Sequence, residues 1–266
     1  MNNFNALTKK LIELNNGSFI SDLICEPTED QKKSLIDGSG NPIEEMLQVN
    51  SSAGLAVNYW RAFELSHKPQ ATVEFEWKKR KPLSRGLPAN IDVVVREGNN
   101  IMFVESKFLE PYYSENEIPR EAYFDVSKYS PFMRDSAGSW VDLFKQASAF
   151  KYYNVTQLCR HLLAISKDIR KSQKEYQNKS IRLISVTWDM PNTFIDGFPQ
   201  EIAEEFKERR KVIREEAIKS ERFLNDFINE NLCSLNLKYQ AVKYNDIINE
   251  ISEPNILARL KEKYYL

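Results

Sequence analysis

Apolar and polar residues follow a strand-like pattern in two short segments near the middle of the chain. The segments are IDVVV (91–95) and IMFVESKF (101–108), and REGNN between them supplies turn-forming Gly and Asn. The pattern predicts a β-hairpin in which the numbers of paired residues sum to 197. Asp92 then lies opposite Glu105, and Lys107 shares the face of Glu105 because side chains alternate along a strand. A three-residue loop would shift this register by one.

Directly opposed carboxylates, with Cβ atoms roughly 4.5 to 5.5 Å apart, should repel each other. We therefore expect a positive charge between Asp92 and Glu105, supplied by Lys107 and a divalent cation. The alternative is a solvated sheet face on which Asp92 makes an ordinary cross-strand ion pair. Ile101 and Phe103 share the face of Glu105, so this face is apolar near the turn and charged at its far end, which favours a cleft.

Flanking segments predict the elements around the hairpin. VEFEW (73–77) alternates as a third strand, with Glu74 and Glu76 on one face. Residues 17–42 are mixed and loop-like, and residues 110–140 contain prolines and aromatics without clear periodicity. The remaining expected elements are helices at 4–15, 43–64 (in one piece, or in two if Ser51, Ser52 and Gly54 break it), 141–168 (one or two) and 199–231, strands at 181–188 and 235–244, and a terminal helix.

This order of elements predicts an α/β sandwich with a mixed central β-sheet flanked by helices. The length of 266 residues and the hydrophobic content of 42% indicate one domain, 1–266, with a single core. We interpret 110–140 as a loop insertion and 199–266 as a helical C-terminal extension. The net charge of −1 means that nucleic-acid contacts must come from local basic patches.

Three widely spaced cysteines, Cys25, Cys159 and Cys233, predict neither a disulfide framework nor a zinc site. The N-terminus lacks the apolar stretch of a signal peptide, and no window approaches the length of a membrane span. We therefore expect a cytoplasmic protein.

The order strand with Asp92, turn, strand with Glu105-x-Lys107 resembles the catalytic hairpin of PD-(D/E)XK, or restriction-endonuclease-like, nucleases. ESKFLEP looks like a variant found in poorly characterised bacterial members. Ile91 stands where the Pro of the name-giving pattern would be. The motif-level resemblance covers residues 73–110.

The resemblance implies a metal-dependent nuclease that hydrolyses DNA phosphodiesters in restriction, defence or repair, with DNA favoured over RNA. Asp92 and Glu105 would bind Mg²⁺, or Mn²⁺ as a substitute, and Lys107 would orient the attacking water. The resemblance is also compatible with a homodimer and with a partner methylase or helicase. The alternative is a non-catalytic nucleic-acid-binding or structural module with the same fold.

Glu76 and Gln157 are the further candidate catalytic residues. Glu76 lies on a strand that places it beside Asp92, although an exposed strand carboxylate is an equal alternative. Family members often take an acidic residue from the preceding helix instead, where Glu44, Glu45 and Glu64 compete. Gln157 and His161 share a helix face, but Gln146 competes with Gln157 and a structural role for His161 is favoured.

A basic run lies between the first two predicted strands, in KKRKPLSRGLPAN. Its position beside the hairpin favours contacts to a nucleic-acid backbone, and a solvated hairpin tip is the equal alternative. The candidate nucleic-acid-binding residues are Lys78, Lys79, Arg80, Lys81 and Arg85.

Overall fold

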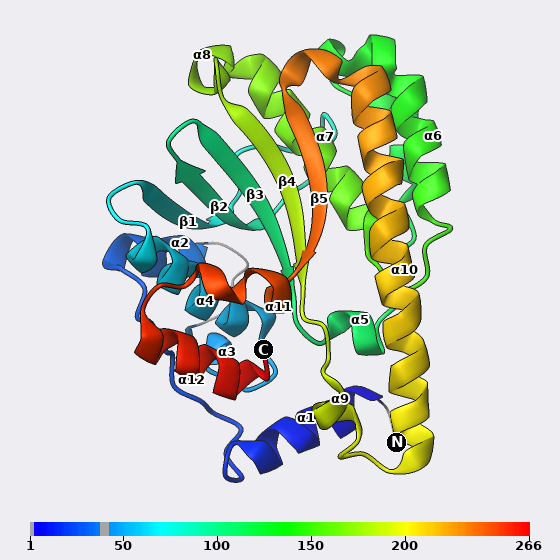
Figure 1. The fold of residues 1–266 in the computed structure, drawn as a ribbon. Helices are drawn as coiled ribbons and strands as arrows, with labels where there is room; N and C mark the ends of the chain where they lie inside the picture. The colour runs from blue at the N-terminus through cyan, green and yellow to red at the C-terminus, as the bar shows by residue number, and fades with distance from the viewer. Residues whose placement is uncertain (1–2, 38–42) are drawn as a thin grey trace.

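A mixed β-sheet forms the centre of the molecule (Figure 1). The computed structural model describes residues 3–37 and 43–266. Within these residues five strands lie in the order β1-β2-β3-β4-β5; β1, β2 and β3 pair antiparallel, and β3, β4 and β5 pair parallel. The strands are β1 (Ala71–Trp77), β2 (Ile91–Glu97), β3 (Asn100–Lys107), β4 (Ser180–Thr187) and β5 (Leu237–Lys243). The predicted α/β fold with a mixed sheet is confirmed.

Helices cover both faces of this sheet (Figure 1). α4 packs on β1, β2 and β3 from one side, while α7 and α10 cover the other side. The longer helices are α1 (Asn3–Leu14), α2 (Glu29–Asp37), α4 (Ser52–Ser66), α6 (Ala137–Ala147), α7 (Val155–Lys171), α10 (Gln200–Asn231) and α12 (Pro254–Tyr264). The short ones are α3 (Ile43–Met46), α5 (Glu110–Tyr113), α8 (Gln173–Tyr176), α9 (Asn192–Ile195), α11 (Tyr244–Ile247) and the 3₁₀ helices Glu121–Tyr123, Val126–Lys128, Pro131–Ser136, Cys233–Leu235 and Ile248–Glu250.

The hairpin of β2 and β3 has the predicted register. Glu97 pairs with Asn100 across the two-residue turn Gly98-Asn99, and the pairing continues to Val93 and Val104. Gly98 has φ +55°, a conformation that a residue without a side chain adopts at little cost. The turn therefore sets the register that brings Asp92 and Glu105 to the same end of the hairpin.

The prediction of a loop over residues 17–42 is wrong for its second half, because Glu29–Asp37 forms helix α2. Thr28 and Gln31 make a reciprocal capping box: the Thr28 N–H donates to Gln31 Oε1 at 2.9 Å, and the Gln31 N–H donates to Thr28 Oγ1 at 3.3 Å. The Gly- and Pro-rich punctuation at 38–42 lies outside the described residues.

The predicted helical region at 43–64 is in two pieces, α3 and α4. Ser51 is the N-cap of α4, and its side chain accepts a hydrogen bond from the Gly54 N–H at 3.1 Å. A Cβ atom at position 54 would lie 2.3 Å from the Met46 carbonyl oxygen, so only glycine allows α3 and α4 to approach here.

The second half of the chain completes the sheet and its outer layer. The predicted helical region at 141–168 is two helices, α6 and α7, and the predicted strands are β4 and β5. Helix α10 packs beside β5 and extends beyond the end of the sheet (Figure 1). The division into a body, an insertion at 110–140 and an extension at 199–266 stays a prediction. In the ranges that the structure describes, no helix is long and apolar enough to cross a membrane.

Candidate active site

Buried Glu105 and half-buried Lys107 form an ion pair near the end of β3. The Lys107 Nζ atom lies 2.7 Å from Glu105 Oε1, and Glu105 is only 1% exposed. The two side chains meet because residues two apart on a strand share a face. Lys107 thus supplies a positive charge to the Glu105 carboxylate, and the divalent cation expected beside it stays a prediction.

His161 binds the other oxygen of the same carboxylate. Its Nε2 atom lies 2.8 Å from Glu105 Oε2, and the imidazole is completely buried on the inner face of α7. Sequence reasoning favoured a structural role for His161 and did not include it among the site residues. The sequence feature that could have identified His161 is its position four residues after Gln157 on the predicted helix.

These neighbours control the charge of Glu105. Burial alone would raise its pKa, but the charges and hydrogen bonds of Lys107 and His161 lower the pKa to about 2. Burial would likewise lower the pKa of Lys107, yet the negative charges of Glu105, Glu110 and Asp92 raise it above its usual value. The pair is thus ionised at neutral pH.

Asp92 lies in a different environment at the same end of the hairpin. The paired positions end at Val93 and Val104, and the Ser106 N–H donates to Asp92 Oδ2 at 2.7 Å. The Asp92 side chain therefore joins the two strands where their main-chain pairing stops. Burial and the nearby Glu105 charge raise the pKa of Asp92 well above its usual value, and Lys107 and the Ser106 hydrogen bond offset this only in part.

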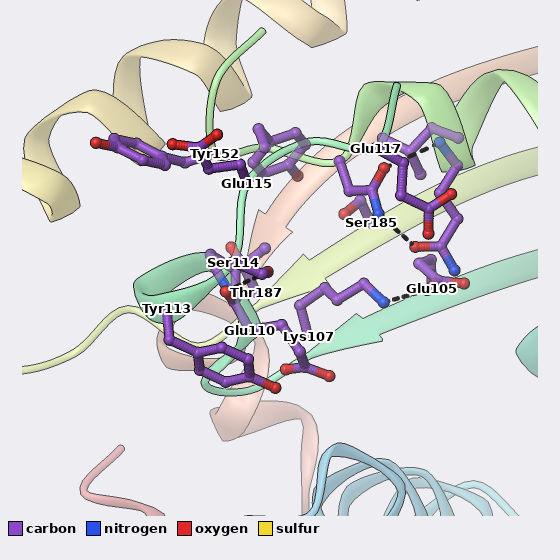
Figure 2. A pocket seen from close by; sticks show the side chains of 15 residues that line it. Glu105, Lys107, Glu110, Tyr113, Ser114, Glu115, Glu117, Tyr152, Ser185 and Thr187 are labelled. Atoms are coloured by element: carbon purple, nitrogen blue, oxygen red, sulfur yellow. Dashed lines mark hydrogen bonds and ion pairs between the residues drawn. The ribbon is translucent and has the colours of Figure 1, made fainter. Parts of the chain in front are cut away.

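A cavity of about 290 Å³, here called the site cavity, opens beside the Glu105–Lys107 pair (Figure 2). Figure 2 shows the Lys107 side chain extending along its floor to Glu105. The lining residues are Glu105, Lys107, Glu110, Pro111, Tyr113, Ser114, Glu115, Glu117, Tyr152, Tyr153, Asn154, Gln157, Leu158, Ser185 and Thr187.

Asp92 lines a second, smaller cavity of about 160 Å³ on the α4 side. Glu76 and Ser106 line it with Asp92, while Lys107 and Glu110 border both cavities. Lys107 thus lines both cavities, whereas Glu105 lines only the site cavity and Asp92 only the cavity on the α4 side. The pairing that was predicted to continue to Asp92 and Glu105 ends one residue earlier, at Val93 and Val104.

Gln157 and Glu76 are both near this centre, in different cavities. Gln157 lines the site cavity, whereas Gln146, its competitor, is exposed and lines neither. Glu76 has φ +57° and its carboxylate accepts a hydrogen bond from Asn90. Its charge helps to raise the pKa of Asp92, so the two carboxylates are close enough to interact.

The acidic competitors from the helices before the sheet lie elsewhere. Glu64 is buried against Arg61 and Gln31, and Glu44 is exposed. Neither lines the two cavities, and the side chain of Glu45 lies outside the described residues.

Glu110 and Ser52 are site residues that sequence reasoning missed. The Phe108 N–H donates to Glu110 Oε2 at 2.9 Å, and the Ser52 hydroxyl donates to Glu110 Oε1 at 2.5 Å. The sequence feature that could have identified Glu110 is that it is a charged residue three positions after Lys107. Ser52 comes from α4, and only the fold brings it to Glu110.

The basic run forms part of the loop between β1 and β2. Arg80 Nε lies 2.7 Å from the buried Asp168 carboxylate, and Lys79 Nζ lies 3.6 Å from Glu175. Lys81 and Arg85 are exposed, while Lys78 is half-buried. Arg80 thus has a structural partner, and the exposed members of the run remain candidates for phosphate contacts.

Comparison with known proteins gives one family. A family model described as "Restriction Endonuclease associating with ARP" matches residues 22–265. No curated protein matches, and no solved structure matches. The matched range contains every strand of the sheet and both cavities.

Proposed function

This chain belongs to the family of restriction endonucleases associating with ARP, which indicates a nuclease, and we propose that it is a metal-dependent enzyme that hydrolyses DNA phosphodiester bonds. The single observation that carries the proposal is the ion pair of buried Glu105 with half-buried Lys107, near Asp92 at the end of the hairpin. We further propose that this hairpin is a PD-(D/E)XK catalytic hairpin.

Asp92 and Glu105 are the proposed metal ligands. Mg²⁺ prefers one or two carboxylates and keeps several waters, so two acidic side chains are a sufficient set. Among the described residues there is no group of three or more His, Cys, Asp or Glu that could hold a metal ion, so the proposed site rests on these two carboxylates. The raised pKa of Asp92 also supports a cation, because an added positive charge would stabilise its ionised form.

A bound Mg²⁺ would activate water and offset charge on the phosphate. The chain itself supplies Lys107, whose ammonium group is held by Glu105 at the floor of the site cavity and is proposed to orient the attacking water. Gln157 is proposed to bind the phosphate or the water from α7, and Glu76 to support Asp92.

The exposed basic residues of the β1–β2 loop are the proposed contacts to the DNA backbone. Lys81 and Arg85 lie on this loop, in a molecule whose net charge is only −1. Local contacts of this kind predict binding that weakens steeply with salt.

Cleavage assays test the proposal directly. Wild type and Lys107→Met would be incubated with supercoiled plasmid, duplex and single-stranded oligonucleotides in Mg²⁺, Mn²⁺ or EDTA. We expect metal-dependent cutting that falls at least about hundredfold in Lys107→Met, while Lys145→Met, an exposed lysine on α6, keeps wild-type activity. Binding without cutting by the wild type in any metal would instead indicate a non-catalytic DNA-binding module.

A further inference from the structure

Two chain segments wall the site cavity. One is 110–117, which follows β3, and the other is 152–158, which leads into α7. Asn116 joins them: its N–H donates to the Lys151 carbonyl at 2.7 Å, and its Oδ1 accepts from the Thr156 N–H at 3.2 Å. These hydrogen bonds fasten the two walls to each other.

Helix α10 holds the second wall through Glu216. This carboxylate is 7% exposed and accepts three successive backbone hydrogen bonds, from Lys151, Tyr152 and Tyr153, at 2.6, 2.8 and 2.9 Å. Hydrogen bonds to an ionised acceptor are stronger than neutral ones. A single buried charge thus satisfies a run of main-chain donors that would otherwise be costly to bury.

Arg209 holds both walls from the same helix. Its guanidinium donates to the Pro111 carbonyl at 2.8 Å and to the Ser114 carbonyl, and it stacks 4.0 Å from the ring centre of Tyr152. The planar, forked donor set of arginine suits such simultaneous contacts.

The contacts from α10 end on the residues that line the site cavity. Pro111, Ser114, Tyr152 and Tyr153 are all lining residues, whereas neither Arg209 nor Glu216 lines the cavity. The two positions are seven apart, about two helical turns, so both lie on one face of α10. Phe223, another seven residues on, continues this face with a ring contact of 5.6 Å to Phe150.

We propose that Arg209 and Glu216 are positioning residues that set the shape of the site cavity for its substrate, with α10 as the rigid support. The inference rests on the proposed nuclease function. Neither residue touches the reacting groups. Both act through the backbone of the walls beside Glu105 and Lys107.

The test compares Glu216→Gln with Glu215→Gln, the same chemical change at an exposed neighbour on α10. In Glu216→Gln the amide group presents an N–H toward backbone N–H groups, so we expect amide hydrogen exchange of 151–153 to rise about tenfold or more. We expect kcat/KM for DNA cleavage to fall about ten- to hundredfold, mainly through KM, with the Mg²⁺ dependence unchanged. Glu216→Asp should recover part of both losses.

Arg209→Lys, with Arg222→Lys as its exposed control, is the second variant, and it should raise exchange in both walls. Exchange that stays at the wild-type rate in Glu216→Gln overturns the inference. Faster exchange with kcat/KM equal to that of Glu215→Gln also overturns it. A wild type that cuts no DNA refutes the proposed function alone, because faster exchange in both walls would still support the positioning role.

Discussion

Asp92 and Glu105 stand at the same end of one hairpin and have opposite electrostatic environments. Glu105 receives Lys107 and His161, so its ionised form is stabilised although it is buried. Asp92 receives one backbone N–H and faces the charge of Glu105, so its ionised form is destabilised. Pairs of titratable groups whose pKa values are pushed apart are typical of catalytic sites.

This asymmetry predicts opposite effects of neutralising each carboxylate. In EDTA at pH 8, Asp92→Asn should raise the Tm, because it replaces a carboxyl group whose ionised form is destabilised by burial and by the Glu105 charge. Glu105→Gln should lower the free energy of unfolding by about 3 to 5 kcal/mol, because it removes the carboxylate that pairs with the half-buried Lys107 ammonium group. Thermal and urea denaturation measure the stability of both variants. Stability changes of the same sign in the two variants would contradict the opposite electrostatic environments of Asp92 and Glu105.

The decrease in the free energy of unfolding at acid pH depends in part on Glu105. Its pKa in the folded protein is about 2, below the usual 4.5, so the unfolded state takes up the proton first as the pH falls. The contribution of Glu105 to stability is then complete above about pH 4.5 and is lost as the pH falls through about 2. Urea titrations from pH 6 downward should show the gap between wild type and Glu105→Gln closing over this window; a gap independent of pH would argue against the lowered pKa.

At the scale of elements, buried charges fix the loops on two sides of the site. Glu216 of α10 binds three successive N–H groups, and Lys167 of α7 binds three successive carbonyls, of Lys81, Pro82 and Leu83, at 2.5, 3.0 and 3.2 Å. The loop that Lys167 holds carries the basic residues proposed to contact DNA. Its conformation therefore depends on a helix that lies about 85 residues later in the chain.

Replacing Lys167 should release this loop. In Lys167→Met the three carbonyls lose their donor, so we expect trypsin to cut at Arg85 at least about tenfold faster than in the wild type. Lys174→Met, an exposed lysine in α8, is the matched control. Time courses followed by mass spectrometry identify the site, and equal rates in the two variants would show that Lys167 does not hold the loop.

Local sequence patterns predicted most elements and failed where a short signal was overlooked. Gly98-Asn99 determined the hairpin register, and Ser51 marked the start of α4. Helix α2 was missed because its low content of apolar residues conceals a periodic face, although Thr28 and Gln31 form a capping box that was legible in the sequence.

For the whole molecule, metal binding should be coupled to folding. If Asp92 and Glu105 hold Mg²⁺ only in the folded state, a Mg²⁺ concentration of 100 times the Kd adds about 2.7 kcal/mol to the free energy of unfolding. We expect Mg²⁺ to raise the Tm of the wild type and EDTA to reverse the shift. Asp92→Asn, which is expected to fold, should show no Mg²⁺ shift; an equal shift in this variant would place the metal elsewhere.

The sequence by itself determined the sheet type, the hairpin and the contact of Glu105 with Lys107, because alternation and turn chemistry act over a few residues. Only the tertiary structure decided which distant side chains contact Glu105, Glu110 and the walls of the site cavity. His161, Ser52 and Glu216 come from three separate helices, and no local pattern specifies which buried polar groups meet when helices pack on a sheet. The same packing tied Arg80 to Asp168. Buried charges and main-chain groups need partners, and those partners can come from any part of the fold.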